Sequence, residues 1–353
     1  MRVAVVGATG AVGSTILGVM RERSFAADEI VPFASERSEG RKIAYSERPA
    51  GASVRSPGDT NLTVTALSEE AIQGFDLALF SAGSSISAEW APRFVDAGAV
   101  VVDNSSQWRM SDDVPLVVAE VNPDALQGHR GIVANPNCTT MQTVMALGPI
   151  LRSVGIERVI MSTYQAVSGT GQRAVDELHR QAEAVIEAHE LPAPAVYPHQ
   201  IAFNVLPQVE TFKDGDDYTT EERKCMFETR KILGRSDVAV SATCARVPVY
   251  TGHSVSANVQ TREPLSPDEC RQLLAKAPGL VVVDDPANAI YPTAIDAAGR
   301  DDVLVGRIRR DPSHDSCLNL WIVGDNLRKG AATNAVQVAE LLSVRGLLRA
   351  ARA

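Results

Sequence analysis

A cysteine near the middle of the chain stands in surroundings that suit a reactive thiol. The stretch NPNCTT, residues 135–140, follows an apolar run typical of a strand and precedes a helical pattern. Pro136 and Asn137 suit a helix entrance, with Asn137 as the N-cap, so Cys138 would lie in the first turn. There the helix dipole stabilises a thiolate, and unpaired backbone N–H groups can bind an oxyanion. The commoner role of a cysteine, a small buried hydrophobe, is the alternative.

The remaining cysteines lack such a setting, and we interpret them as packing residues: Cys225, Cys244, Cys270 and Cys317. A thiol nucleophile needs a base, and the chain has six histidines. His253 lies in VPVYTGHS, where a strand ends in a glycine turn and another begins, which would hold an imidazole rigidly. The other five fall in charged helices, polar turns or a proline-flanked loop, so spacing alone leaves His253 one candidate among several.

A glycine-rich loop follows the first apolar run. In GATGAVG, residues 7–13, the glycines have the spacing GxxGxxG, a variant of the dinucleotide-binding fingerprint. Glycines let the backbone approach a pyrophosphate, whose charge is held by N–H groups at a helix N-terminus. Mere turn chemistry is the alternative. We predict cofactor contacts from Gly7, Thr9, Gly10, Ala11, Val12 and Gly13.

The end of the second predicted strand, ASERSEG, should select the cofactor. Ser35, Arg37 and Ser38 can donate hydrogen bonds to a 2′-phosphate, which favours NADP. Glu36 could instead bind the ribose hydroxyl of NAD, and a solvated turn is the third interpretation.

The first third of the chain supplies elements that could hold this loop. Short apolar runs predict strands over 2–8, 29–35, 76–83 and 99–105, and helical spacing falls over 11–23 and 87–98. This alternation predicts a doubly wound parallel sheet of the Rossmann type. Residues 38–61, rich in Gly, Ser, Pro and charge, are predicted to be loop with short edge strands.

After residue 138 the pattern changes. A helix over 139–155 precedes longer strands of period two over 158–169, 237–250, 253–263 and 302–311. They predict a largely antiparallel or mixed sheet, backed by helices over 170–189 and 220–233, and a C-terminal helix covers 327–344. Thr219 and Glu222 fit a capping box at the start of the 220–233 helix, which gives Glu222 a structural role.

Composition narrows the classes of function. The length of 353 residues suits about two domains. A net charge of −9 without a basic tract disfavours nucleic acid and anionic membrane. No apolar run approaches the ~20 residues of a membrane span, and the first strand leaves no room for a signal peptide. Five scattered cysteines without a CxxC pair predict neither disulfides nor a metal site, and hence a cytoplasmic protein.

An ordered set of motifs resembles the aspartate-β-semialdehyde dehydrogenase family. The motifs are NPNCTT with the glycine loop, DNSSQWRM (103–110), STYQAVSGTG (162–171), RVPVYTGHS (246–254) and GDNLRKGAATNAVQ (324–337). The resemblance runs from the first strand to the last helix. It implies a Rossmann-type NADP-binding domain over 1–134 with the C-terminal helix 330–353. An α+β catalytic and dimerisation domain of the glyceraldehyde-3-phosphate-dehydrogenase-like type would cover 135–329.

The resemblance also implies a reaction. Family members interconvert L-aspartyl 4-phosphate and L-aspartate 4-semialdehyde with NADP and phosphate, and biosynthesis of lysine, threonine and methionine uses the reductive direction. They usually pair through the second domain as homodimers, or as dimers of dimers. By position, Cys138 would form the acyl thioester, His253 would be the acid/base, and Gln165 would orient the substrate.

The other implied residues bind ligands. Substrate contacts would come from Arg246 at the α-carboxylate, Glu221 at the amino group, Arg109 and Lys224 at phosphate, and Asn137. The nicotinamide end of the cofactor would be held by Ser168, Gly169 and Asn326. The chemistry supports one choice independently, because a guanidinium matches a carboxylate with two parallel hydrogen bonds and explains arginine over lysine at position 246.

Simpler interpretations remain for these residues. Arg109 and Arg246 could be surface salt-bridge partners, and Gln165 could cap a strand. Glu221 and Lys224, three positions apart, could form a plain ion pair on a helix. Two rival functions also remain: a thioester-forming reductase of the same scaffold acting on another acyl phosphate, and a non-catalytic NADP-binding sensor.

Overall fold

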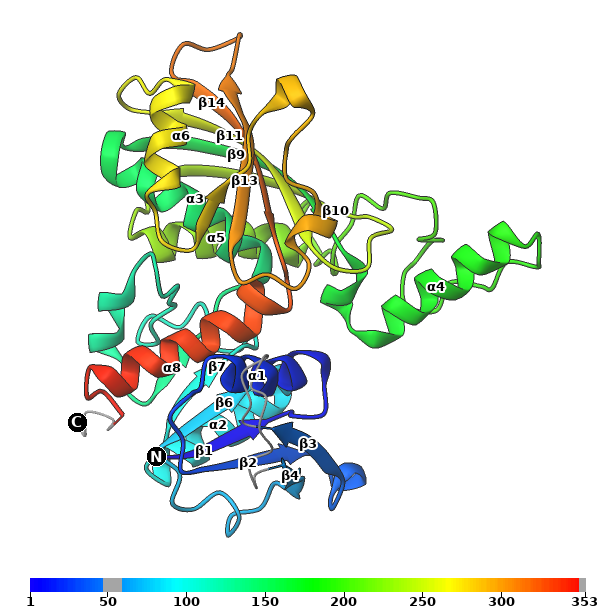
Figure 1. The fold of residues 1–353 in the computed structure, drawn as a ribbon, viewed down its shortest axis with the longest axis vertical. Helices are drawn as coiled ribbons and strands as arrows, with labels where there is room; N and C mark the ends of the chain where they lie inside the picture. The colour runs from blue at the N-terminus through cyan, green and yellow to red at the C-terminus, as the bar shows by residue number, and fades with distance from the viewer. Residues whose placement is uncertain (47–58, 349–353) are drawn as a thin grey trace. The chain divides into compact units, whose positions relative to one another are not determined.

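The computed structural model describes residues 1–46 and 59–348 and divides the chain into two compact units (Figure 1). Unit 1 comprises Met1–Asn137 and Ala331–Ala353, so the C-terminal segment completes a unit that the N-terminus begins. Unit 2 comprises Cys138–Gly330. Each unit contains one six-stranded sheet. No helix within the described residues is long and apolar enough to cross a membrane.

The sheet of unit 1 is parallel throughout, with the strand order β5-β2-β1-β6-β7-β8. Its strands are β1 (Arg2–Val6), β2 (Glu29–Ala34), β5 (Thr65–Ala66), β6 (Leu77–Phe80), β7 (Val100–Asp103) and β8 (Ile132–Ala134). Strands β2 and β6 lie on opposite sides of β1. The strand order therefore reverses at β1, which is where open α/β sheets bind ligands.

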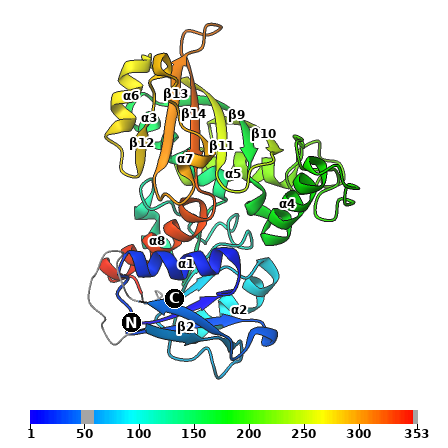
Figure 2. The same cartoon turned by 45° about the vertical axis from the view of Figure 1, so that its right-hand side comes forward.

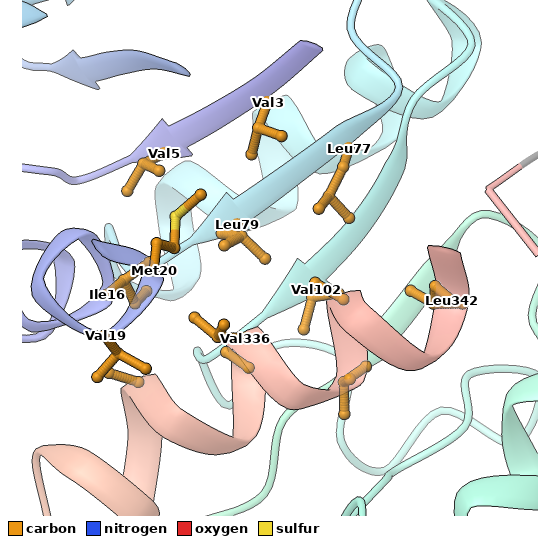
Figure 3. Packing of buried hydrophobic residues seen from close by; sticks show 14 of the residues in the cluster. Val3, Val5, Ile16, Val19, Met20, Leu77, Leu79, Val102, Val336 and Leu342 are labelled. Carbon is orange, nitrogen blue, oxygen red and sulfur yellow. The ribbon is translucent and has the colours of Figure 1, made fainter. Parts of the chain in front are cut away.

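Helices cover both faces of this sheet, as the continuous apolar strands require. On one face α1 (Ala11–Glu22) and α8 (Asn334–Val344) pack on β1, β6 and β7 in one hydrophobic cluster (Figure 3). On the other face lies α2 (Ser84–Asp96), where the rings of Phe33, Phe75, Phe80 and Phe94 meet edge-on or tilted. The predicted doubly wound sheet is confirmed.

Smaller elements complete unit 1. Strands β3 (Lys42–Ser46) and β4 (Asp59–Thr63) pair antiparallel, where short edge strands are predicted, and residues 47–58 of that predicted segment lie outside the described residues. The 3-10 turn η1 (Glu36–Ser38) follows β2, and η2 (Pro123–Gly128) precedes β8.

The sheet of unit 2 is mixed, with the order β10-β9-β11-β14-β13-β12. Its strands are β9 (Ile156–Gln165), β10 (Ala239–Arg246), β11 (His253–Thr261), β12 (Leu280–Val282), β13 (Val303–Arg310) and β14 (Cys317–Gly324). The outermost pairs are parallel and the inner pairs antiparallel. The mixed sheet is confirmed, although the predicted strands omit β12 and the central β14.

One face of this sheet carries α3 (Cys138–Val154), α5 (Thr220–Leu233) and α6 (Pro267–Ala275). Helix α3 packs on the strands and contacts both α5 and α6, and every residue from Thr139 to Ile150 is buried. The capping box of Thr219 and Glu222 is present at the start of α5, as predicted. The short η4 (Pro286–Asn288) and α7 (Ala294–Ala297) follow β12, and the π-helical turn η5 (Arg328–Thr333) precedes α8.

The prediction that the 170–189 helix backs the sheet is wrong. That helix, α4 (Gln172–Ile186), extends away from the sheet in both views of the fold (Figures 1 and 2). Its apolar side instead meets η3 (Val167–Thr170) and the 196–206 segment in a separate small core. The amphipathic pattern of the helix predicts that one face is buried, but it does not predict which segment of the chain covers that face.

Candidate active site

Strand register brings the predicted catalytic residues to one edge of the second sheet. Strands β9 and β10 run parallel and end together, with Gln165 opposite Arg246. Strand β11 runs antiparallel to β9 and begins at His253, one residue before the pair Ser254 and Tyr164. The ends of two strands and the start of a third therefore meet, although Gln165 is far from Arg246 and His253 in the sequence.

Cys138 opens α3, as predicted, and is partly exposed, whereas the other four cysteines are buried. Its turn is tied to the strand edge through its neighbour, because Gln165 donates a hydrogen bond from Nε2 to Thr139 Oγ1. The same Nε2 lies 2.9 Å from Glu221 Oε1. Gln165 thus joins the helix that carries the sulfur to a buried carboxylate.

The chain after β14 packs against the cysteine. A Cβ added to Gly330 would lie 2.9 Å from the Cβ of Cys138, so only glycine fits there without movement. Asp325 holds this segment in place, because its carboxylate accepts hydrogen bonds from the N–H groups of Leu327 and Arg328 and its carbonyl accepts the Gly330 N–H at 2.9 Å. Neither Gly330 nor Asp325 is singled out by the sequence, although both lie within the 324–337 motif.

The imidazole of His253 is 1% exposed and is held through its Nδ1. The backbone N–H of Ala166 donates to Nδ1 at 3.0 Å, so the neutral ring carries its proton on Nε2. Burial, and then the positive charge of Arg246, lower the pKa of His253 well below its ordinary value. The resting ring is therefore neutral and offers an Nε2–H donor.

Arg246 is buried with part of its hydrogen-bonding capacity unused. Its Nη1 donates to the carbonyl of Ala166 at 2.6 Å, and its guanidinium carbon lies 5.8 Å from the centre of the Tyr197 ring. Its Nε, also buried, has no hydrogen-bond partner among the described residues. An unsatisfied buried donor costs about 1–3 kcal/mol, more if charged. A bound anion would remove that penalty. The burial of Arg246 also excludes its simpler interpretation as a surface salt-bridge partner.

The residues predicted at the nicotinamide end pack beside these two side chains. A Cβ at Gly169 would lie 3.3 Å from both Arg246 Nη1 and His253 Nε2. Asn326 donates from Nδ2 to Ser168 Oγ at 2.9 Å and accepts the Gly252 N–H at 3.0 Å. The Asn326 amide therefore fastens η3 to the turn that precedes His253.

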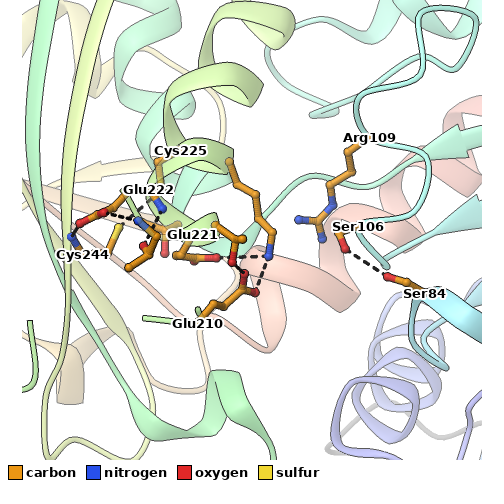
Figure 4. A network of polar contacts seen from close by, with 12 residues as sticks. Ser84, Ser106, Arg109, Glu210, Glu221, Glu222, Cys225 and Cys244 are labelled. Atoms are coloured by element: carbon orange, nitrogen blue, oxygen red, sulfur yellow. Dashed lines mark hydrogen bonds and ion pairs between the residues drawn. The ribbon is translucent and has the colours of Figure 1, made fainter. Parts of the chain in front are cut away.

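The acidic side of the site lies at the start of α5 (Figure 4). Glu221 is 3% exposed, and Lys224 pairs with Glu210 and lies 3.5 Å from Glu221 Oε2. The ion pair offered as the simpler interpretation of Glu221 and Lys224 is thus present. Glu222 accepts the Cys244 N–H at 2.9 Å in addition to its capping role, so its structural assignment is confirmed.

Comparison with known proteins places the chain. A family model described as the NAD binding domain of semialdehyde dehydrogenases matches residues 2–129, and one described as their dimerisation domain matches 147–329. An aspartate-semialdehyde dehydrogenase of Aquifex aeolicus is 52% identical over 350 residues, covering 98% of this chain and 99% of its own. The chain belongs to the aspartate-semialdehyde dehydrogenase family.

Two further members of the family support this placement. An aspartate-semialdehyde dehydrogenase of Legionella pneumophila is 50% identical over 353 residues, covering 99% of this chain and 97% of its own. Aspartate semialdehyde dehydrogenase II of Vibrio cholerae, solved in complex with ASA, is 44% identical with a TM-score of 0.89. That structure covers 97% of this chain, and this chain covers 98% of it.

The glycine loop of this family member fits a dinucleotide. Gly7 has a φ of +85°, and a Cβ there would lie 2.8 Å from the Ser81 carbonyl group. A Cβ at Gly13 would lie 2.2 Å from the Gly7 oxygen, so the loop closes without side chains. Gly10 immediately precedes α1, whose first N–H groups can hold a phosphate. The loop therefore has the shape that the pyrophosphate of NADP needs.

The remaining predicted residues of unit 1 lie outside that loop. Ser35 and Arg37 are exposed at η1, directly after β2, with Ser38 half-buried. Arg109 is 8% exposed and donates from Nη2 to the Asn104 carbonyl at 2.7 Å, and Asn137 is buried at the end of the unit. Burial makes a surface salt bridge an incomplete account of Arg109.

Proposed function

We propose that this chain catalyses the reversible NADPH-dependent reduction of L-aspartyl 4-phosphate to L-aspartate 4-semialdehyde and phosphate, with Cys138 as the thioester-forming nucleophile. The observation that carries this proposal is a partly exposed cysteine at the start of α3, beside a sheet edge where Gln165, Arg246 and His253 are 1%, 5% and 1% exposed. Burying several polar groups together lowers the stability of a fold, and such clusters are typical of active sites.

Charge complementarity supports an amino-acid substrate. The buried Nε of Arg246 lacks a partner among the described residues, and a substrate α-carboxylate would supply one. Glu221 offers a buried carboxylate for the substrate ammonium, and its hydrogen bond from Gln165 keeps it next to the helix that carries Cys138. The two opposite charges favour a zwitterion over an N-acylated analogue, which has no ammonium.

The chain's own groups account for the acyl transfer. The sulfur attacks the acyl carbon, a C–S bond forms, and phosphate leaves with the electrons of the C–O bond. The neutral His253 donates a hydrogen bond from Nε2 to the carbonyl oxygen as negative charge develops on it. NADPH, when bound, supplies the hydride that reduces the thioester carbon. The negative oxygen then re-forms the carbonyl, the C–S bond breaks, and the aldehyde leaves with Cys138 restored as a thiolate.

We also propose which residues bind the phosphate and the cofactor. Arg109 and Lys224 are proposed to hold the leaving phosphate, and on binding Lys224 would exchange its pairing with Glu210 for the phosphate. Residues 1–137 with 331–353 are proposed as the NADP-binding domain, and 138–330 as the catalytic and dimerisation domain. Arg37, exposed after β2, is proposed to hold the 2′-phosphate of NADP.

A second copy of the chain is the proposed macromolecular partner. The range 147–329 matches the dimerisation domain of the family. Helices cover one face of the sheet in that range, whereas Ile160 and Tyr164 of β9 point to the other face and are 40% and 37% exposed. Exposed apolar side chains on a sheet face suit an isologous contact. Tyr164→Glu should therefore shift the sedimentation profile from dimer to monomer.

We also propose a cytoplasmic location. All five cysteines lie in the described part of the chain and none is bridged, and four of them are buried as thiols, which suits a reducing compartment. Cell fractionation tests this assignment.

Turnover decides between this function and its rivals. With phosphate and NADP, aspartate semialdehyde should be oxidised with phosphate-dependent formation of NADPH. N-acetylglutamate semialdehyde, the substrate type of a related reductase, should not be. Alkylation of the thiols should abolish the reaction. Binding of NADP without turnover of either aldehyde would instead identify a non-catalytic sensor.

A further inference from the structure

A buried glutamine lies one helical turn after the cysteine. Gln142 is 1% exposed and belongs to the run of consecutive buried residues in α3. Its Nε2 donates to the backbone carbonyl of His253 at 3.1 Å. Its Oε1, equally buried, has no hydrogen-bond partner among the described residues.

The half-satisfied amide is unfavourable for stability. A carbonyl oxygen that loses water and gains no donor destabilises the folded state, whereas methionine would fill nearly the same volume without that penalty. The surroundings in α3 are largely apolar, so packing alone does not demand an amide at this position. A function of the hydrogen bond to His253 explains its presence better than folding does.

The opposite strand leaves room for this side chain. Gly324 ends β14 and is the register partner of His253. A Cβ at Gly324 would lie 2.8 Å from Gln142 Oε1 and 3.3 Å from Gln142 Cβ. The glycine and the amide are therefore complementary, and any larger residue at 324 would displace the amide.

We propose that Gln142 is a positioning residue that fixes the sulfur of Cys138 relative to the imidazole of His253. The helix turn that begins at Cys138 is tied by Gln142 to the residue that carries the ring. The ring is fixed at its other end by the Ala166 N–H on Nδ1, at 3.0 Å. With both ends held, the Nε2–H cannot drift from the acyl group on the sulfur. This inference rests on the proposed roles of Cys138 and His253.

Gln142→Met removes the hydrogen bond and keeps the volume. Turnover is measured well below the Tm of each variant, so that lost stability does not enter the rate. We expect kcat to fall roughly 10- to 100-fold, because a small misplacement of reacting groups has effects of that size. KM for aspartate semialdehyde should stay within about threefold of wild type, and Tm should be unchanged or higher.

Thr229→Val is the matched control. Thr229 of α5 is also fully buried, and its Oγ1 likewise has no partner among the described residues. The isosteric valine should raise or preserve Tm and leave kcat at the wild-type value. A role of Gln142 that is only structural predicts the same behaviour for Gln142→Met as for this control.

Gly324→Ala tests the same contact from the other strand. The added methyl displaces the flexible end of Gln142, and kcat should again fall with little change in KM. Combined with Gln142→Met, its effect should be far less than additive.

Wild-type kcat in Gln142→Met would overturn the inference, whatever the Tm. If Cys138→Ser is inactive while Gln142→Met is fully active, only this inference fails. Wild-type activity in Cys138→Ser would instead remove the nucleophile assignment in the proposed function, on which this inference rests.

Discussion

In unit 1 the loop proposed to bind the cofactor is one unbroken stretch, residues 7–13 after β1, whereas in unit 2 the proposed active-site edge gathers residues from distant stretches. The proposed binding by this loop depends on backbone N–H groups and on the absence of side chains, so the glycine spacing reveals the loop in the sequence. The edge works with buried side chains whose meeting depends on the register of β9, β10 and β11. The same chain therefore holds one site that is local in sequence and another that exists only after folding.

Cys138→Ser should separate the two sites most sharply. Serine is a far weaker nucleophile than a thiolate, so turnover should fall roughly 10⁴-fold or more. NADP affinity, measured by titration calorimetry, should be unchanged because the loop of unit 1 is untouched. Cys270→Ser is the control: burial raises the pKa of Cys270 to about 12, so this thiol is inert and its loss should spare turnover. Near-wild-type rates in Cys138→Ser would end the nucleophile assignment.

Arg246→Lys should weaken substrate binding at the active-site edge without abolishing it. A lysine keeps the charge but cannot make two parallel hydrogen bonds to a carboxylate. We expect kcat/KM for aspartate semialdehyde to fall roughly 10- to 100-fold, as for the loss of a charge-assisted hydrogen bond. NADPH affinity should not change. An unaltered kcat/KM would show that Arg246 does not bind the α-carboxylate.

Arg37→Leu addresses the cofactor site alone. If the guanidinium holds the 2′-phosphate, NADPH affinity should fall about tenfold, or about 1.4 kcal/mol, while NADH binds as before. Fluorescence titration with both cofactors measures the difference. Equal losses for the two would place the 2′-phosphate elsewhere.

Each unit contains a histidine whose burial should make the fold less stable in acid, and we expect the larger effect from unit 2. Burial lowers the pKa of His129 in unit 1, and burial with Arg246 lowers the pKa of His253 in unit 2 well below its ordinary value. Each histidine binds fewer protons when folded, so the free energy of unfolding falls as pH drops below about 6.5 towards the folded pKa.

Replacing these histidines should flatten that dependence. Between pH 7 and 5.5, His253→Gln should lose about 1 kcal/mol less of unfolding free energy than wild type, and His129→Gln should lose less by a smaller amount. Urea titrations across this pH range measure the difference. A slope for His253→Gln as steep as that of wild type would mean that the ring takes up its proton equally in the folded and unfolded protein, so that its pKa is not lowered by folding.

Sequence reasoning went furthest where structure is local. The capping box at Thr219 and Glu222, the helix that starts at Cys138, and the burial of the other four cysteines are confirmed. Each of these features is determined by residues a few positions apart, through short-range hydrogen bonds or the hydrophobicity of the residue itself.

Short-range patterns in the sequence could not predict which elements pack together over long distances. The direction of α4 depends on a small core with the 196–206 segment, and the central strand β14 went unrecognised beside clearer strands. The contacts of Gln142 and Gly330 follow from which strand ends meet α3. One signal for Gln142 is visible in retrospect, namely an amide in a helix whose neighbours are mostly apolar.

The most direct test of the central claim is to trap the acyl enzyme. The protein is mixed with aspartate semialdehyde and NADP without phosphate, quenched within the first turnover, digested and examined by mass spectrometry. One aspartyl group should be found on the peptide that contains Cys138, and added phosphate should discharge it. Formation of NADPH with that peptide unmodified, or an aspartyl adduct that persists in Cys138→Ser, would contradict the account.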